Sequence, residues 1–225
     1  MNQDQIFTSG EGDEWYKRNQ THLMTIDQAK ESEDVRYLCE TLQPFHFNIH
    51  RVLEVGCSNG IKLETICQQM NAVGIGIEPS RLAVETGNLR DKVAKIDLIQ
   101  GSGDKLPCKS ADFDLVFFAF CLYLFDRASL MQAFAEADRV LKPGGFLVVT
   151  DFDPGFNHRR PYSHCPGVFS YKQDYSVFFT QSGLYHLLGK HSYSHRYPHF
   201  DKDRGERVST SILYKEANPY STYQG

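Results

Sequence analysis

One stretch, residues 51–60, constrains the fold of this chain more than any other. It begins with Val52–Val55, a largely apolar run of the kind that a parallel strand needs when both of its faces are covered. Gly56 and Gly60 follow, and glycine lets a chain turn tightly and lets a ligand come close to the backbone. The apolar residues of 61–70 then recur at helical spacing. The unpaired N–H groups at the start of this helix should therefore face the turn and attract an anion.

Three classes of ligand site use such a turn, and the spacing separates them. A dinucleotide site has the pattern G-x-G-x-x-G, but here its second and third glycine positions hold Ser58 and Ile61. The same residues also spell G-x-S-x-G, the nucleophile elbow of α/β-hydrolases, with Ser58 as the nucleophile. That elbow follows several strands in its own fold, whereas the residues before Ser58 are mostly helical or polar. A serine hydrolase is therefore the weaker alternative.

The third class includes Glu54 in the pattern, as Glu54-x-Gly56-x-Ser58-x-Gly60. This pattern resembles the first motif of class I S-adenosylmethionine-dependent methyltransferases, which usually has glycine where this chain has Ser58. The resemblance implies that Gly56, Cys57, Ser58 and Gly60 lie against the amino-acid end of the cofactor. It also implies that Glu54 helps to hold the ammonium group, since a carboxylate and a helix N-terminus can each meet one charge of a zwitterion. A turn that only packs a sheet is the structural alternative.

A second buried strand is predicted over 72–77, and it ends in Glu78 and Pro79. One carboxylate in this position can accept hydrogen bonds from both hydroxyls of a ribose. Methyltransferases and NAD enzymes share this device, so Glu78 and Pro79 indicate a nucleoside ligand without choosing between the two classes. A solvated glutamate that starts a loop is the alternative interpretation.

The segment 101–107, Gly-Ser-Gly-Asp-Lys-Leu-Pro, is similar to the adenine-lining segment of the same family. The resemblance implies contacts from Gly103 and Asp104 to the adenine. Ser102 departs from the family pattern because it stands where an acidic residue is usual. We therefore expect backbone groups to make most of these contacts.

Later segments extend the resemblance. A strand is predicted over 113–118, and Ala119 and Phe120 at its end should border the cofactor. Residues 139–149, Arg-Val-Leu-Lys-Pro-Gly-Gly-Phe-Leu-Val-Val, closely resemble the helix, turn and strand that follow in the family. Alternating strands and helices favour a parallel sheet with right-handed crossovers. The expected fold class is a Rossmann-like α/β fold with seven strands, mostly parallel, an antiparallel last strand and helices on both faces.

The length of 225 residues suits one sizeable α/β domain, so we expect a single methyltransferase domain over 1–225. An amphipathic helix over 26–42 should cover one face of its sheet. The predicted parts are an N-terminal lid (1–24), a cofactor-binding core (25–151), a substrate-side insertion (152–186), and closing strands near 187–194 and 207–215 with a tail (187–225).

The lid prediction depends on residues 7–19, which are polar and contain two glycines that permit hinging. Trp15 and Tyr16 stand beside Lys17 and Arg18, which suits a ligand better than a core. We expect Trp15 and Arg18 to contact the cofactor and Tyr16 to contact the acceptor when the segment closes. A frayed N-terminus is the alternative. Residues 10–19 also resemble small bacterial methyltransferases encoded among surface-polysaccharide genes, which implies a small polar acceptor such as a sugar derivative.

The resemblance implies in-line attack by an acceptor oxygen or nitrogen on the sulfonium methyl of S-adenosylmethionine. The protein then has to align both partners and remove a proton. Residues 152–186 should form a loop with a short helix at the acceptor site. The predicted acceptor-binding residues are Arg159, Arg160, Tyr162 and Tyr175. The catalytic base is unknown, and its candidates, each of which has a surface-loop role as the alternative, are Asp151, Asp153, His158 and His164.

The composition of the chain limits the kinds of partner that the protein is expected to bind. A formal charge of −4 without a basic block argues against a nucleic-acid backbone. No apolar run reaches the length of a membrane span, so we expect a cytoplasmic protein, monomeric or homodimeric, with a small-molecule acceptor. His191, His195 and His199 do not predict a metal site, because four residues of a strand span about 13 Å. A non-catalytic protein that binds S-adenosylmethionine or S-adenosylhomocysteine is the other functional alternative.

Overall fold

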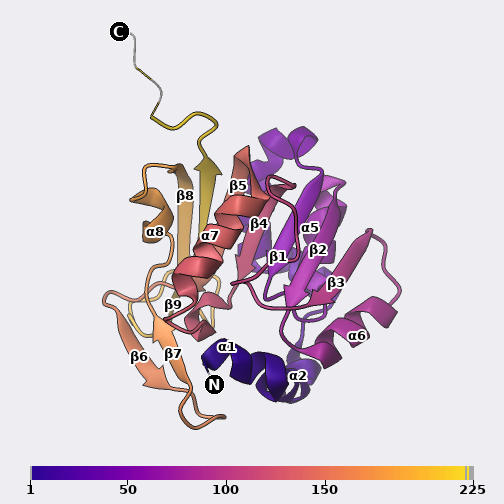
Figure 1. The fold of residues 1–225 in the computed structure, drawn as a ribbon, viewed down its shortest axis with the longest axis vertical. Helices are drawn as coiled ribbons and strands as arrows, with labels where there is room; N and C mark the ends of the chain where they lie inside the picture. Colours follow the sequence, from indigo (N-terminus) through magenta and orange to yellow (C-terminus); the bar gives the residue numbers. More distant parts are fainter. Residues whose placement is uncertain (1, 221, 223–225) are drawn as a thin grey trace.

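A computed structural model describes residues 2–220 and 222. In this part of the chain a seven-stranded sheet lies beside a two-stranded one (Figure 1). The strand order of the large sheet is β3-β2-β1-β4-β5-β9-β8. Its strands are β1 (Arg51–Val55), β2 (Val73–Glu78), β3 (Ile96–Gln100), β4 (Phe113–Ala119), β5 (Leu141–Phe152), β8 (Tyr185–Ser194) and β9 (Arg207–Lys215).

The order of the strands creates a crevice at one edge of the large sheet. β1 pairs in parallel with β2 on one side and with β4 on the other, so the chain leaves β1 in one direction and later returns to its other flank. In open α/β sheets ligands bind at such a reversal, outside the carboxyl ends of the strands. β9 runs antiparallel to β5 and β8. The predicted mostly parallel sheet with an antiparallel closing strand is confirmed.

Helices cover both faces of this sheet because the apolar residues of its strands alternate in direction. Val52 joins an apolar cluster with Leu38 and Leu63 on one face, whereas Leu53 joins a cluster with Phe134 on the other. The helices around the sheet are α3 (Ile26–Glu31), α4 (Glu33–Leu42), η3 (Gln43–Asn48), α5 (Ile61–Met70), α6 (Arg81–Leu89) and α7 (Leu130–Val140).

The single helix predicted over 26–42 is wrong, because the chain breaks at Ser32 into α3 and α4. Ser32 has an extended backbone, and its hydroxyl donates to the carbonyl oxygen of Ala29 at 2.7 Å. A serine that bonds the backbone of the preceding turn competes with helix continuation. In α3 only Ala29 is buried, so little packing opposes this break.

Two regions outside the large sheet differ from the sequence-based expectation. The N-terminal segment is helical and consists of α1 (Gln3–Ile6), the π-helix η1 (Phe7–Glu11), α2 (Gly12–Asn19) and η2 (Gln20–His22). Residues 152–186 were expected as a loop with a short helix. They contain the hairpin β6 (His158–Pro161) and β7 (Phe169–Lys172) as well as α8 (Val177–Thr180). The hairpin strands are short and β6 is largely exposed, so their hydrophobic alternation is weak.

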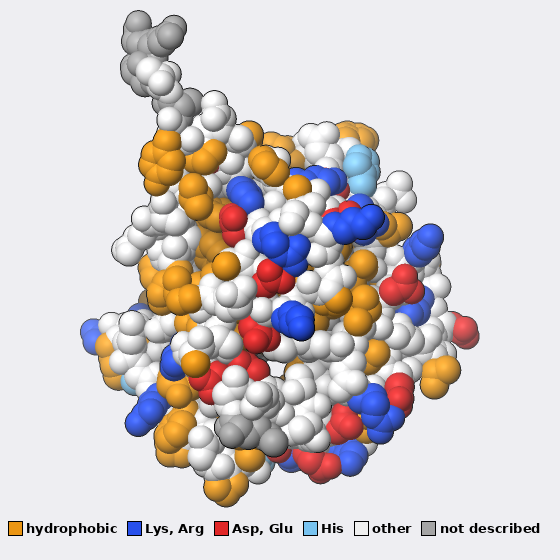
Figure 2. All heavy atoms as spheres, in the orientation of Figure 1, with side chains coloured by type: hydrophobic (Ala, Val, Ile, Leu, Met, Phe, Trp, Pro, Cys, Tyr) orange, Lys and Arg blue, Asp and Glu red, His pale blue; other side chains and the backbone are white. Residues whose placement is uncertain are grey.

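Figure 1 shows the indigo N-terminal segment below the sheet, beside the β6–β7 hairpin. On the face shown in Figure 2, acidic and basic side chains are interspersed over the surface. None of the helices among the described residues is long and apolar enough to cross a membrane.

Candidate active site

The turn after β1 is held in a conformation that requires its glycines. Gly56 and Gly60 both have φ of +79°, a region that side chains disfavour. A Cβ on Gly56 would stand 2.6 Å from the Cβ of Cys121, in the loop after β4. Ser58 also adopts positive φ, at 49°. The turn therefore passes close to the end of β4 and leaves its backbone open toward the crevice.

Glu54 lies near the carboxyl end of β1 and is almost fully buried. Its Oε2 atom has no hydrogen-bond partner among the described residues. Burial raises the pKa of Glu54 to about 8, although the nearby Lys62 opposes this shift. A buried carboxyl oxygen without a partner is costly, so it requires an explanation. A cationic ligand group beside Glu54 would supply one.

Glu78 at the end of β2 is also buried, but both of its oxygens accept hydrogen bonds. The backbone N–H of Ser58 donates at 2.8 Å and that of Ser80 at 3.0 Å. Burial raises the pKa of Glu78 to about 7, while these N–H groups act in the opposite direction. Because a carboxylate has about four acceptor positions, Glu78 can fix the turn and still accept from ligand hydroxyls.

A cavity of about 680 Å³ extends along this edge of the sheet. It takes its walls from the ends of β1, β2, β4 and β5, from the N-terminal segment and from the loop after β8. Ten of the residues predicted to bind the cofactor line it, namely Trp15, Glu54, Gly56, Cys57, Ser58, Glu78, Pro79, Gly103, Ala119 and Phe120.

Comparison with known proteins shows which family this part of the chain resembles. Residues 52–145 match the family described as "Methyltransferase domain". Over these residues, which include the glycine turn and the ends of β1, β2 and β4, the chain is similar to methyltransferases. A solved structure, an S-adenosylmethionine-dependent methyltransferase from Clostridium acetobutylicum, shares the fold at a TM-score of 0.61 and 13% identity, over 90% of this chain and 97% of that one.

Curated relatives are similar over the same region. Demethylmenaquinone methyltransferase of Tropheryma whipplei is 37% identical over 103 residues, which are 45% of this chain and 41% of the relative. Phthiotriol/phenolphthiotriol dimycocerosates methyltransferase 1 of Mycobacterium ulcerans is 29% identical over 105 residues, 46% of this chain and 38% of the relative. The chain thus spans less than half the length of these relatives.

Three of the residues predicted to bind cofactor do not line the cavity of the methyltransferase domain. Gly60 stands at the start of α5, where a Cβ would meet Leu98. Arg18 pairs with Glu11 and donates to the hydroxyl of Tyr162 at 3.1 Å. Asp104 follows the lining residue Gly103 but is itself absent from the wall.

The residues predicted to bind the acceptor also lie outside this cavity. Tyr16 is buried, and Tyr175 lies in the apolar core with its hydroxyl donating to the carbonyl oxygen of Tyr171 at 2.6 Å. The guanidinium of Arg159 stacks over Phe169. Arg160 is exposed on β6, and Tyr162 contacts the ring of Phe7.

The four candidate bases are outside the wall as well. Asp151 is buried at the end of β5, and burial raises its pKa to about 7. It accepts from the backbone N–H groups of Phe152 and Tyr123, so it supports the loop after β4. Asp153 is paired with Lys190 at 2.8 Å. His158 and His164 contact neighbouring aromatic rings.

Sequence reasoning missed a group of aromatic residues at the β4 and β5 end of the cavity. Phe152, Tyr193 and Val208 form an apolar cluster against which Phe120 and Tyr123 pack. His195, which follows β8, stacks on Phe120 with ring centroids 5.2 Å apart and planes 16° apart. Tyr193, His195 and Val208 line the cavity. Tyr193 and His195 are two residues apart at the end of β8, but nothing local in the sequence indicated that they meet Phe120.

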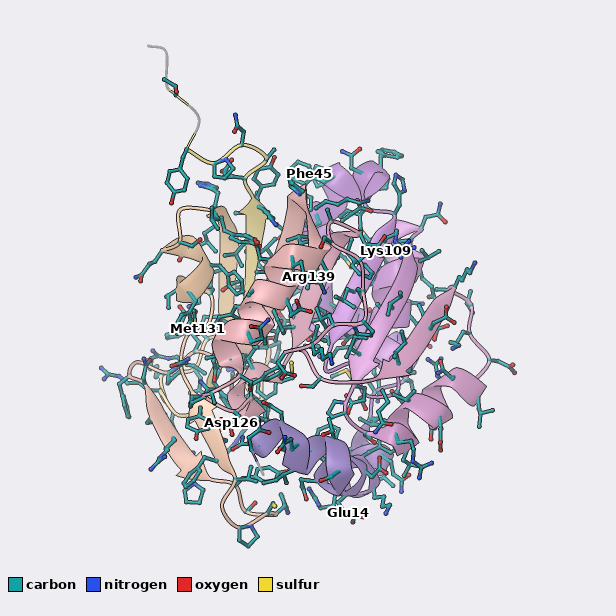
Figure 3. All side chains as sticks on the ribbon, viewed as in Figure 1. Glu14, Phe45, Lys109, Asp126, Met131 and Arg139 are labelled. Carbon is teal, nitrogen blue, oxygen red and sulfur yellow. The ribbon has the colours of Figure 1, made fainter. Side chains whose placement is uncertain are left out.

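The N-terminal segment is attached on both sides of the cavity. On one side Asp13 accepts from the hydroxyl of Ser80 at 2.7 Å and from the backbone N–H of Leu82 at 2.9 Å. On the other side the backbone N–H of Gln3 donates to Asp126 at 2.8 Å, and Asp4 accepts from Ser129. Figure 3 shows Asp126 beside α1. Phe7, Gly12 and Trp15 of this segment face the cavity.

Among the described residues no three His, Cys, Asp or Glu side chains gather around a possible metal position. The three histidines with four-residue spacing stand apart. His191 contacts Glu33 at 3.1 Å, His195 stacks on Phe120, and His199 stacks on Tyr197.

Proposed function

We propose that this protein transfers the methyl group of S-adenosylmethionine to an oxygen or nitrogen atom of a small-molecule acceptor, releasing S-adenosylhomocysteine. The observation that carries the proposal is the pair Glu54 and Glu78, which lie at the ends of neighbouring strands and face one cavity. One acid has an unpartnered oxygen suited to an ammonium group. The other supports the glycine turn and retains acceptor capacity for a ribose.

The charged groups of the cofactor complement the charged groups of the cavity wall. Glu54 would meet the ammonium group of the methionine part. The N-terminus of α5 and the ammonium of Lys62, which lines the cavity, would meet its carboxylate. Glu78 would hold the ribose, and the backbone near Gly103 would border the adenine. When bound, S-adenosylmethionine supplies a methyl group that is already activated, so alignment and water exclusion are the tasks left to the protein.

The acceptor is less constrained than the cofactor. The names of the two curated relatives refer to different acceptors, one a demethylmenaquinone and the other a phthiotriol derivative. A small polar metabolite such as a sugar derivative remains a prediction from the sequence. In this proposal the acceptor would be contacted by residues that line the cavity, and Arg159 and Arg160 lie outside it.

Titration calorimetry with S-adenosylmethionine, S-adenosylhomocysteine and NAD tests the cofactor assignment. We expect saturable binding of both sulfur compounds and none of NAD. Glu78→Ala should weaken S-adenosylhomocysteine at least about tenfold, because a hydrogen bond to a charged acceptor contributes about 1.5–3 kcal/mol. Glu85→Ala is the matched control, since Glu85 lies on α6 and pairs only with the exposed Arg81 among the described residues. Saturable NAD binding without binding of either sulfur compound would refute the proposal.

A further inference from the structure

We propose that the acceptor is a weakly acidic hydroxyl on a planar ring, a phenol or an enol, and that His195 removes its proton as the methyl group is transferred. This inference rests on the proposed function, because it concerns the acceptor end of the same cavity. It narrows the acceptor to one chemical class and assigns a base that lies outside the four sequence-based candidates.

The position of His195 follows from a short series of contacts. Its ring stacks on Phe120 at the carboxyl end of β4. The next residue, Cys121, packs against Gly56, and its thiol donates to the carbonyl oxygen of Val55 at 3.2 Å. Phe120 and Cys121, which are neighbours in the sequence, therefore connect His195 to the glycine turn. An acceptor beside His195 would lie next to the amino-acid end of the cofactor.

The wall around His195 suits a flat, largely apolar ring. Phe120 and Tyr123 have ring centroids 5.3 Å apart, and both pack on the cluster of Phe152, Tyr193 and Val208. The Tyr193 hydroxyl is within 3.3 Å of Thr210 Oγ1, so it is already engaged. Aromatic surfaces of this kind favour stacked or edge-on packing of another ring. The acceptor ring would thus be held by its faces, and its hydroxyl would meet the imidazole.

His195 is available as a base. Its ring nitrogens make no hydrogen bond among the described residues, and its side chain is exposed along the cavity. Desolvation by the surrounding rings lowers the pKa of His195, Lys172 and Arg196 act in the same direction, and Glu206 opposes them. The imidazole is therefore mostly neutral at neutral pH and can accept a proton.

Two carboxylates of the cavity wall, those of Glu33 and Asp34, are engaged elsewhere. Asp34 pairs with Lys62, and Glu33 pairs with Arg36 and contacts His191. Although burial opposes the shift, the ammonium of Lys62 holds the pKa of Asp34 below its ordinary value, so the Asp34 carboxylate is a weaker base.

The proposed step balances in atoms and charge. The acceptor oxygen attacks the sulfonium methyl, and a carbon–oxygen bond forms as the carbon–sulfur bond breaks. The electron pair of the broken bond stays on sulfur, which gives S-adenosylhomocysteine. The hydroxyl proton passes to a ring nitrogen of His195, and from this exposed side chain it is lost to solvent. The products are a methyl ether, S-adenosylhomocysteine and one proton.

The test uses two phenols of different acidity, 4-nitrophenol and 4-methoxyphenol, with S-adenosylmethionine as donor and mass spectrometry of the ethers. We expect the wild-type protein to methylate both. His195→Phe keeps a ring on Phe120 but removes the base, so kcat for 4-methoxyphenol should fall about 100-fold or more. The fall for 4-nitrophenol should be far smaller, because this phenol ionises readily in water. KM and the affinity for S-adenosylhomocysteine should change little.

The pH profile gives a second readout. With 4-methoxyphenol the wild-type rate should rise through one ionisation and level off near neutral pH, and His195→Phe should lose this ionisation. His186→Phe is the matched control, because His186 is an exposed histidine near the start of β8, the strand that His195 follows. His195→Gln is measured in parallel, so the result does not depend on one substitution folding.

Each outcome is decisive. Equal losses on both phenols with an unchanged pH profile would make His195 a positioning residue and overturn the assignment of the base. Binding of S-adenosylhomocysteine without methylation of either phenol would overturn the acceptor class and leave the proposed function standing. Absence of S-adenosylhomocysteine binding would instead refute the proposed function itself.

Discussion

Glu54 and Glu78 lie at the ends of adjacent strands, yet their surroundings prepare them for different ligand groups. Both oxygens of Glu78 accept backbone hydrogen bonds, whereas Glu54 keeps one oxygen without a partner. The Glu54 carboxyl is therefore the group whose protonation should change most when a cation arrives. Burial alone favours its neutral form, and an adjacent ammonium favours its charged form.

This difference predicts proton release on binding. With its pKa raised to about 8, Glu54 is mostly protonated at neutral pH in the ligand-free protein. An ammonium group beside it should lower the pKa below neutral, so binding of S-adenosylhomocysteine should release about one proton. Calorimetry in two buffers of different ionisation enthalpy measures this number directly.

Glu54→Gln should abolish most of the release and weaken binding, while Glu64→Gln serves as the control. Glu64 is a buried acid of α5 that pairs with Arg90 and is absent from the cavity wall. Proton uptake by the wild-type protein would contradict the role given to Glu54.

At the level of residues, the cofactor half of the site could be predicted from the sequence because its determinants are local. Glu54, Gly56 and Gly60 lie close together in the sequence, at the end of β1 and in the turn after it, and Glu78 ends the next strand. His195 could not be predicted in this way. It reaches Phe120 only because β8 joins the large sheet through β9, a pairing that no local pattern specifies.

Among the elements, the N-terminal segment forms part of the cavity wall although it lies outside the sheet. Its helices contribute five wall residues, Asp4, Phe7, Gly12, Trp15 and His22, and they connect the start of α6 to the loop before α7. Its polar composition concealed this packing, because only a few residues such as Phe7 and Tyr16 are buried. A segment with so few apolar contacts depends on its hydrogen bonds, so it can open at modest cost.

We expect this segment to act as a lid. Asp13→Ala removes two hydrogen bonds to the start of α6, and it should weaken S-adenosylhomocysteine about 3- to 10-fold. In the wild-type protein, saturating S-adenosylhomocysteine should shift the emission of Trp15, the only tryptophan in the chain, to the blue and slow proteolysis between Gly10 and Arg18. The Asp13 variant should show smaller changes in both measurements.

Glu14→Ala is the neighbouring control. Glu14 is exposed on the outward side of α2 and pairs only with Lys17 among the described residues (Figure 3). If saturating ligand leaves both the emission and the proteolysis of the wild-type segment unchanged, the segment is a fixed wall and has no gating role.

Over the whole molecule, the alternation of strands and helices was enough to predict the large sheet, because buried parallel strands have strong apolar runs. The β6–β7 hairpin and the break at Ser32 were not predictable, since exposed short strands and a single serine leave little periodic signal. The missed features are therefore the ones stabilised by specific contacts more than by burial of a continuous apolar face.

The raised pKa values of the buried acids together predict how the free energy of unfolding depends on pH. Burial raises the pKa of Glu54 to about 8 and those of Glu78 and Asp151 to about 7. At any pH between the ordinary and the raised pKa of these acids, the folded protein binds more protons than the unfolded chain. The free energy of unfolding should therefore fall as pH rises from about 5 to about 8, by up to about 1.4 kcal/mol per pH unit for each group.

Urea denaturation across this range measures the slope. His195, whose pKa is lowered, acts in the opposite direction, and acids with lowered pKa such as Asp13 and Asp126 contribute only at more acidic pH. Glu54→Gln should flatten the curve, and saturating S-adenosylhomocysteine should flatten the curve of the wild-type protein in the same way. A free energy of unfolding that rises steadily over the same range would contradict the assignment.

The attachment of the N-terminal segment on both sides of the cavity also bears on the order of events in turnover. The residues after β8, including His195 and Arg196, are exposed, so the acceptor end has a route to solvent while the segment stays closed. The cofactor end is covered by Gly12, which packs within contact distance of Ser80. We expect a compulsory order of binding and release. S-adenosylmethionine would bind before the acceptor, and the methylated acceptor would leave before S-adenosylhomocysteine. Turnover would then be limited by exchange of the nucleoside, and strong inhibition by S-adenosylhomocysteine would follow.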